Sequence, residues 1–167
     1  MKKLLIWIAA GTVLLLSGCS SKSCKEGILQ PDTIYEKALV NTREAQVVRS
    51  LETKASVNAT LLNEVFPEKY PYEKGVYMFV GVITDRKVPD DTFPDFFHLK
   101  LNGGTPLKIE AVHRGDELYE LMPSVNRWGR YYVAVFPPSK AKLFTLTFGI
   151  DPYAPVELKF QRPTPRR

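Results

Sequence analysis

The chain has 167 residues, of which 44% are hydrophobic, 25% charged and 11% aromatic, a composition typical of a folded globular protein and not of a disordered one. Of its 23 basic side chains, Lys2 and Lys3 belong to an N-terminal segment that we expect to be removed, which leaves 21 against 18 acidic ones, a balance too even to indicate a nucleic-acid-binding protein. A chain of about 150 residues buries roughly 70% of its unfolded surface, which is enough for one self-sufficient core.

The N-terminal residues form a short apolar segment with a defined end. Lys2 and Lys3 precede an apolar run that starts at Leu4 and ends on Leu16-Ser17-Gly18-Cys19. This run of about 13 residues is shorter than the roughly 20 that a membrane-spanning helix needs. A cleaved export signal over residues 1–18 is therefore favoured over a transmembrane anchor.

The four residues that end the run resemble a lipobox, the processing motif of bacterial lipoproteins. The resemblance implies cleavage between Gly18 and Cys19 and acylation of Cys19, and two or more acyl chains hold a protein stably on a membrane. Ser20 follows the cysteine in place of Asp, which by the sorting rule of many two-membrane bacteria implies the outer membrane, facing the periplasm. In a bacterium with one membrane, the protein would lie on the outer surface.

Residues 19–31 are small, polar and charged, which predicts a flexible tether. The chain has two cysteines, and acylation of Cys19 would leave Cys24 without a partner in the chain. We interpret Cys24 as an idle thiol in preference to a cysteine that pairs with another protein. Packing, and not disulfides, is then expected to stabilise the domain.

A helix is predicted from Thr33 to about Glu52, with an interruption near Asn41. Thr33 and Glu36 have the spacing of a capping box. Apolar residues recur near one helical face, at Ile34, Ala38, Ala45 and Val48. Both charge signs occur on the polar face, so we expect this helix to cover the body of the protein and not to bind a membrane.

The rest of the chain shows the alternating pattern of strands. We predict strands over 55–61, 76–83, 97–101, 107–111, 118–121, 131–136, 143–148 and 156–160. The run 76–83 is apolar on both sides, as in a central strand, and Asn102-Gly103-Gly104 predicts a hairpin between its neighbouring strands.

Because no helix separates these strands, the sequence predicts an antiparallel β-sandwich over residues 32–161, either immunoglobulin-like or transthyretin-like, followed by a basic tail at 162–167. Trp128 and Tyr131 are weak candidates for the core tryptophan and the tyrosine corner of such domains.

Residues that could perform chemistry are few. The only histidines are His98 and His113, and no second ligand stands at a spacing typical of metal sites. Three carboxylates, Asp90, Asp91 and Asp95, lie within six residues and could bind a cation, although turn residues in solvent explain them more simply. No nucleophile motif, phosphate loop or dinucleotide motif occurs, so we predict neither an enzyme nor a cofactor.

Two predicted loops contain clusters of aromatic residues, namely Phe66, Tyr70 and Tyr72 in the first, and Phe93 and Phe96 in the second. These rings could contact a partner, or they could plug the ends of the sandwich, and the second interpretation is favoured unless they are exposed and contiguous.

We therefore expect a non-enzymatic envelope lipoprotein with a structural, adaptor or protein-binding role. Its partners would be the membrane, through the anchor at Cys19, and another envelope protein. Type VI secretion lipoproteins are similar in architecture, a likeness of fold alone. The alternative is a small-ligand or cation-binding periplasmic module, in which His98, His113 and the Asp90–Asp95 loop converge on one pocket.

Overall fold

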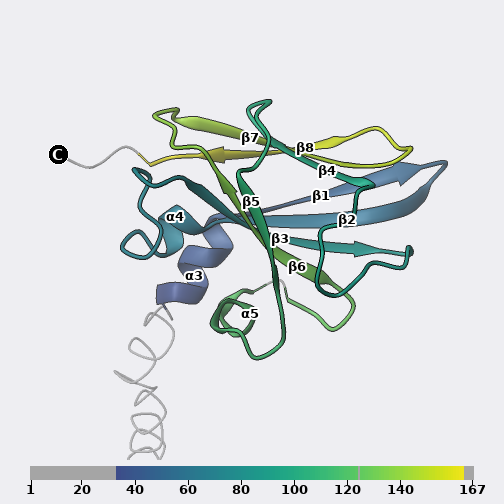
Figure 1. Cartoon of the computed structure of the whole chain (residues 1–167), viewed down its shortest axis with the longest axis horizontal. Helices are drawn as coiled ribbons and strands as arrows, with labels where there is room; N and C mark the ends of the chain where they lie inside the picture. The colour runs from purple at the N-terminus through teal and green to yellow at the C-terminus, as the bar shows by residue number, and fades with distance from the viewer. Residues whose placement is uncertain (1–32, 124, 164–167) are drawn as a thin grey trace, which may run out of the picture. The chain divides into compact units, whose positions relative to one another are not determined.

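The computed structural model describes residues 33–123 and 125–163 (Figure 1). Gly18, Cys19, Cys24 and the predicted tether lie outside the described residues. No helix in the described ranges has the length and apolar character needed to span a membrane.

The described chain is mainly β, and its strands form two antiparallel sheets, which confirms the predicted sandwich. The larger sheet has five strands, in the order β1 (Thr42–Arg49), β2 (Glu52–Leu61), β3 (Val76–Thr84), β6 (Arg130–Phe136) and β5 (Lys108–Val112). The smaller sheet has three, in the order β4 (Phe97–Leu101), β7 (Leu143–Ile150) and β8 (Val156–Gln161).

The main core lies between the two sheets. Along β3, the buried Met78 and Val80 belong to this core, whereas Phe79 between them points to the opposite face and belongs to a second cluster. Successive side chains of a strand alternate between its faces, so β3 is covered on both sides, as predicted for residues 76–83.

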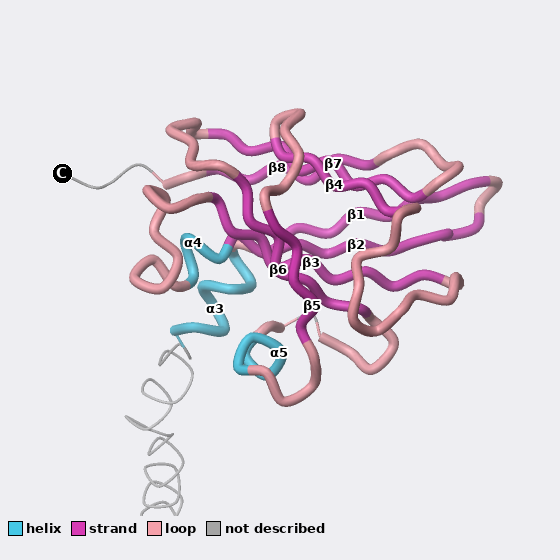
Figure 2. Tube along the Cα trace, in the orientation of Figure 1, coloured by secondary structure: helices cyan, strands magenta, loops and turns pink. Residues whose placement is uncertain are grey.

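In the described ranges, three short helices cover the outer face of the larger sheet (Figure 2). They are α3 (Thr33–Val40), α4 (Leu62–Val65) and α5 (Glu117–Leu121). The buried side chains of Ala38, Leu62 and Leu118, one from each helix, belong to the cluster around Phe79. The structure is thus a layer of helices, a five-stranded sheet and a three-stranded sheet.

The sandwich has two ends, which we name after their loops. At one end Val76 pairs with Phe136, and loop 62–75 lies there; we call this the aromatic end. At the other end Val82 pairs with Arg130, and loops 85–96 and 113–129 meet there; we call this the cationic end.

The predicted long helix is wrong beyond Val40, because residues 42–49 form β1, which pairs with β2. Val47 is buried in the core between the sheets, whereas Val48 is 55% exposed, so the apolar face is that of a strand and not of a helix. The two strands are joined at Ser50 and Leu51, both with positive φ (51° and 67°). Such angles are uncommon for residues other than Gly, Asn and Asp, so the sequence carries no usual turn signal here.

The predicted hairpin at Asn102-Gly103-Gly104 is also wrong, although its turn forms. Leu101 and Gly104 exchange both backbone hydrogen bonds, at 2.8 and 2.9 Å, and then the chain crosses to the other sheet, so that β4 pairs with β7 and β5 pairs with β6. In a continued hairpin, the next hydrogen-bonded pair would join Leu99 to Pro106. Pro106 has no N–H to donate, and the pairing ends.

Residues 118–121 form part of α5 and not a strand. Leu118 and Met122 are both buried in the cluster around Phe79, and their spacing of four residues is that of one helical face. Trp128 is 68% exposed and is not a core tryptophan. Tyr131 is buried, and its hydroxyl contacts the backbone of Asn126 five residues upstream, as in a tyrosine corner.

Candidate functional site

The predicted partner-binding residues are all partly buried, and they are divided between the two ends of the sandwich. Phe66 and Tyr70 pack on the helix-side cluster, whereas Tyr72, Phe93 and Phe96 pack on the core between the sheets. These positions match the interpretation of the rings as plugs, because the five rings do not form one exposed surface.

Tyr72 is the most constrained ring of the aromatic end. It stacks on Phe144 with ring centroids 6.1 Å apart, and the Arg162 guanidinium lies 3.9 Å from the centre of the Tyr72 ring. The Tyr72 hydroxyl donates a hydrogen bond of 2.6 Å to Glu64 Oε1. Burial, and then this bond, raise the pKa of Tyr72 well above its usual value. The ring and its hydroxyl are therefore held in one position.

Asn63 organises the backbone of the same end. It is 2% exposed, and its Nδ2 donates to the carbonyls of Tyr70 (2.8 Å) and Gly75 (2.9 Å). Its Oδ1 accepts from the Tyr77 amide at 2.8 Å. One buried side chain thus satisfies three backbone groups of loop 62–75 and the start of β3.

The two histidines do not converge. His98 lies on β4, where its Nε2 is 2.9 Å from Asp151 Oδ2, whereas His113 follows β5, with its Nε2 3.4 Å from Asp91 Oδ1. The two side chains line separate depressions. The prediction of a single pocket containing both is wrong, because the strands that carry them belong to different sheets. Within the described ranges, no group of three or more His, Cys, Asp or Glu residues is arranged to hold a metal ion.

The cationic end instead has a hollow lined by arginines. This cationic hollow has a volume of about 260 Å³ and is lined by Asp90, Val112, His113, Arg114, Tyr119, Arg127, Gly129, Arg130 and Tyr131. A neighbouring depression of about 310 Å³ shares Asp90 and Arg130 and adds Arg86, Lys87 and Trp128 to its lining. The two depressions thus share the Arg130–Asp90 ion pair, in which Nη2 and Oδ1 are 2.7 Å apart.

The turn that carries Arg127 and Trp128 is fixed by hydrogen bonds. Asn126 Oδ1 accepts from the Trp128 amide (2.9 Å) and the Gly129 amide (3.0 Å). The Asn126 amide donates to the buried Tyr131 hydroxyl at 2.7 Å. The Arg127 guanidinium lies 4.4 Å from the centre of the Trp128 ring. Hydrogen bonds therefore hold the turn backbone both before Arg127, at Asn126, and after it, at Trp128 and Gly129.

The turn that carries Arg114 is held in a similar way. Asp116 Oδ2 accepts from the His113 amide at 2.7 Å, and the Asp116 amide donates to the His113 carbonyl at 3.1 Å. Gly115 has a φ of 92°, a conformation that glycine adopts without strain. Arg114 thus stands at the tip of a tight turn beside the cationic hollow.

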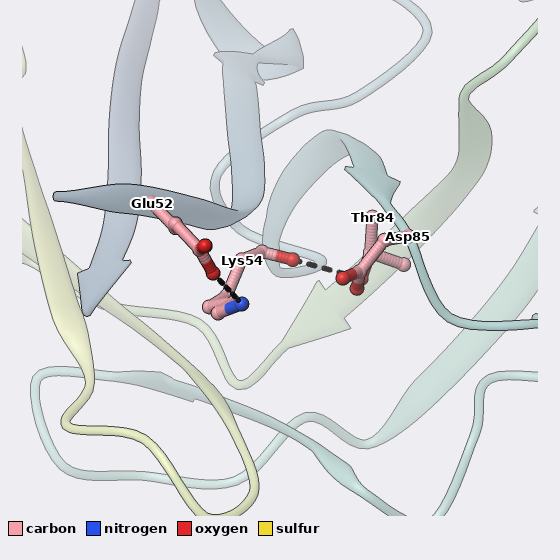
Figure 3. Close-up of polar contacts among 4 residues, drawn as sticks. All are labelled: Glu52, Lys54, Thr84 and Asp85. Carbon is pink, nitrogen blue, oxygen red and sulfur yellow. Dashed lines mark hydrogen bonds and ion pairs between the residues drawn. The ribbon is translucent and has the colours of Figure 1, made fainter. Parts of the chain in front are cut away.

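The root of the loop that carries Arg86 and Lys87 is tied to β2 (Figure 3). The Thr84 hydroxyl donates to the Lys54 carbonyl at 2.9 Å, and the Arg86 amide donates to the Thr84 hydroxyl at 3.3 Å. The Lys54 ammonium contacts the carboxylate of Glu52, and this hydrogen bond raises the pKa of Lys54. The loop therefore leaves the sheet from a defined position.

Sequence reasoning missed the arginines of the cationic hollow, because they are far apart in the chain and follow no known motif. The segments His113-Arg114-Gly115 and Arg127-Trp128-Gly129-Arg130 place basic residues beside glycines, in positions typical of turns. That signal shows exposed cations, but it does not show that two turns meet at one end of a sheet. No known protein family, curated protein or solved structure matches the chain.

Proposed function

We propose that this protein is a membrane-anchored envelope lipoprotein with a structural, adaptor or protein-binding role that is not enzymatic. The observation that carries the proposal is the motif Leu16-Ser17-Gly18-Cys19 at the end of a short apolar run. Acyl chains on Cys19 would anchor the protein, and Ser20 favours the outer membrane, facing the periplasm. The motif lies outside the described residues and rests on the sequence.

Exposed apolar side chains on α3 support a binding role. Nine large apolar side chains are exposed in the described ranges, and four of them, Ile34, Tyr35, Leu39 and Val40, belong to this eight-residue helix. Clustered exposed apolar side chains mark interaction sites. Because α3 follows directly on the predicted tether, we propose that the exposed part of this helix docks on an apolar surface of another envelope protein close to the membrane.

The chain offers a matched pair of variants for the anchor, Cys19→Ala and Cys24→Ala. Radiolabelled palmitate is expected to label the wild type and Cys24→Ala but not Cys19→Ala, which should also keep the mass of the uncleaved signal. Label and mass are better measures than membrane retention, because an uncleaved apolar run can itself hold the protein on a membrane. Equal labelling and equal mass of the two variants would refute the lipid anchor.

A site-specific photo-crosslinker tests the docking face. Placed at Val40, it is expected to yield one discrete protein adduct in intact cells, whereas the same group at Leu143, which is 56% exposed on β7, is expected to yield none. Crosslinks to lipid alone from Val40 would show that α3 rests on the bilayer and would contradict the protein-docking role.

The cationic hollow favours a second candidate function, a small-ligand-binding periplasmic module. The hollow brings three arginines to one depression, and a guanidinium is a fitting donor for oxyanions. It does not favour cation binding, because arginine has no acceptor to offer a metal ion.

A further inference from the structure

The charge lining the cationic hollow defines the class of ligand it could take. Three arginines and one carboxylate, that of Asp90, line it, so these four side chains have an excess of two positive charges. A phosphate group with one ester bond carries a charge of about −1.5 to −2 at pH 7 and presents three acceptor oxygens. A carboxylate supplies one charge and two oxygens, which leaves part of the excess uncompensated.

The geometry of the arginines also suits an oxyanion. Arg114 and Arg127 are exposed, and each projects from a turn that side-chain hydrogen bonds hold in place. Because the backbone is already ordered, binding avoids the cost of ordering a loop, and among the protein groups mainly the two side chains lose freedom. Arg130, on β6, lines the same hollow, and its Nε is buried without a hydrogen-bond partner among the described residues.

The aspartates at the hollow do not prevent an anion from entering. The Asp90 side chain is 73% exposed and the Asp91 side chain is 86% exposed, although they face Arg130 and His113. Exposed ion pairs of this kind contribute little to stability. A ligand with more negative charge can therefore replace Asp90 at the Arg130 guanidinium.

We propose that the cationic hollow binds the phosphate group of a ligand, whether that group belongs to a soluble molecule or to a lipid headgroup. The proposal names the ligand class of the second candidate function, and it does not depend on the acylation of Cys19. Arg114, Arg127 and Arg130 would contact the phosphate oxygens. Arg86 and Lys87, in the neighbouring depression, would attract any further negative charge on the ligand.

Calorimetric titration of the full chain, purified in a neutral detergent, tests the proposal with four probes. These are inorganic phosphate, the short-chain lipid dihexanoyl phosphatidic acid, dihexanoyl phosphatidylcholine and a hexaglutamate peptide. Binding of inorganic phosphate identifies a soluble phosphate source, and binding of phosphatidic acid alone identifies a lipid headgroup. Either result supports the proposal, provided that phosphatidylcholine does not bind.

The test variant is the double substitution Arg114→Gln/Arg127→Gln, and the control is Arg162→Gln at the aromatic end. Each charge-assisted hydrogen bond removed is expected to weaken phosphate binding at least about tenfold, whereas the control should bind like the wild type. Both substituted arginines are exposed, so the thermal unfolding midpoint is expected to stay unchanged and to exclude misfolding as the cause.

Three results would overturn the proposal. The first is that neither inorganic phosphate nor phosphatidic acid binds, or that phosphatidylcholine, with its diester phosphate and choline cation, binds as tightly as they do; the second is equal weakening in the control and the double variant. The third is binding of hexaglutamate without binding of phosphate, because this would assign the hollow to an acidic protein segment. None of these results bears on palmitate labelling of Cys19, so failure here and failure of the anchor are distinguishable.

Discussion

The aromatic end and the cationic end of the sandwich use polar side chains in opposite ways. At the aromatic end, the buried Asn63 bonds three backbone groups, and Arg162 covers the Tyr72 ring. At the cationic end, Asn126 and Asp116 fix the turns, and three arginines with one carboxylate line a single hollow, whereas Arg162 shares its depressions with Glu64 and Glu73. The first arrangement stabilises the fold, whereas the second leaves donors available to a ligand.

The difference shows that similar residue types can serve packing at one end and recognition at the other. Aromatic rings close the cationic end as well, since Phe93 packs edge-on against Tyr132 with ring centroids 5.1 Å apart. Arg86 lies 5.1 Å from the centre of the Phe96 ring in that layer, whereas Arg114 and Arg127 are exposed. Variants at the two ends should therefore separate losses of stability from losses of binding.

The largest expected effect is that of Asn63→Ala at the aromatic end. The substitution leaves two carbonyls and one amide unbonded beside a side chain that is 2% exposed. Each buried unsatisfied group costs about 1–3 kcal/mol, so the free energy of unfolding is expected to fall by about 3 kcal/mol or more. Denaturant unfolding followed by circular dichroism measures the loss.

Asn126→Ala is the counterpart of that variant at the cationic end. It removes two hydrogen bonds to turn amides that are closer to solvent, so a loss of about 1 kcal/mol is expected. Its phosphate affinity should fall as well, because Arg127 loses its fixed turn. If the two asparagine variants lost equal stability, the proposed difference between the ends would not hold.

The second prediction concerns Gly81, in the middle of β3, which supports the cationic end from beneath. A Cβ added there would lie 2.5 Å from Asn58 Oδ1 and 2.6 Å from Cε1 of Tyr131, the ring whose hydroxyl holds Asn126. Gly81→Ala should therefore push the ring outward, and overpacking of this kind costs about 1–3 kcal/mol. Unfolding experiments should show this loss, and calorimetry should show weaker phosphate binding.

Gly103→Ala serves as its control. Nothing lies within 4 Å of a Cβ added at Gly103, and the cost there comes only from a φ of 84°, about 1 kcal/mol. Phosphate binding is expected to be unaffected. Weaker binding in Gly103→Ala would show that the loss in Gly81→Ala does not arise from Tyr131.

The third prediction is a pH dependence. Burial raises the pKa of Tyr132 to about 12, although the nearby Arg130 lowers it in part. The unfolded chain releases this proton near pH 10. The stabilisation that comes from keeping Tyr132 protonated in the folded state is therefore fully present below about pH 10. It is lost as the pH rises to about 12, by about 2–3 kcal/mol in total.

Tyr132→Phe is expected to remove this part of the alkaline loss and to leave the stability at pH 7 nearly unchanged, because the Tyr132 hydroxyl makes only a long hydrogen bond of 3.4 Å. Urea unfolding from pH 7 to pH 11.5 measures the slope for both proteins. Tyr72→Phe, a variant at the aromatic end, should also reduce the loss of stability at high pH, since burial raises the pKa of Tyr72 as well. An unchanged slope in both variants would contradict the burial argument.

The sequence predicted the sandwich, because apolar alternation is a local signal and the buried residues Val57, Ala59 and Leu61 follow it. It failed where a partner strand decided the outcome. Residues 42–49 have a pattern compatible with a helix, but pairing with β2 makes them a strand. Leu101 and Gly104 start the predicted hairpin, yet the choice of sheet depends on β6 and β7.

The candidate site was less predictable than the fold. The aromatic clusters were visible as residue types, but whether Tyr72 or Phe93 plugs a core or faces a partner depends on neighbours from distant strands. The cationic hollow needs turns at 113–116 and 126–129 to meet, which no local pattern of the chain encodes. Asn126 and Tyr131 could have suggested a fixed turn, because Asn bonds backbone groups in turns.

The smallest expected effect concerns the two tight turns, which also differ between the ends. The turn at the aromatic end has Asn102 and Gly103 at its positive-φ positions, whereas the hairpin tip at the cationic end has Ser50 and Leu51. A residue with a Cβ in this conformation costs about 1 kcal/mol relative to glycine, part of which the greater freedom of glycine in the unfolded chain offsets. Leu51→Gly is therefore expected to stabilise the protein by about 0.5 kcal/mol.

Leu51→Ala separates backbone strain from the removal of an exposed side chain. Leu51 is fully exposed, so truncation to Ala removes no packing and leaves the φ of 67° equally unfavourable. Its free energy of unfolding should match that of the wild type within about 0.3 kcal/mol. A gain in Leu51→Ala as large as that in Leu51→Gly would show that backbone strain is not what distinguishes this turn from Asn102-Gly103.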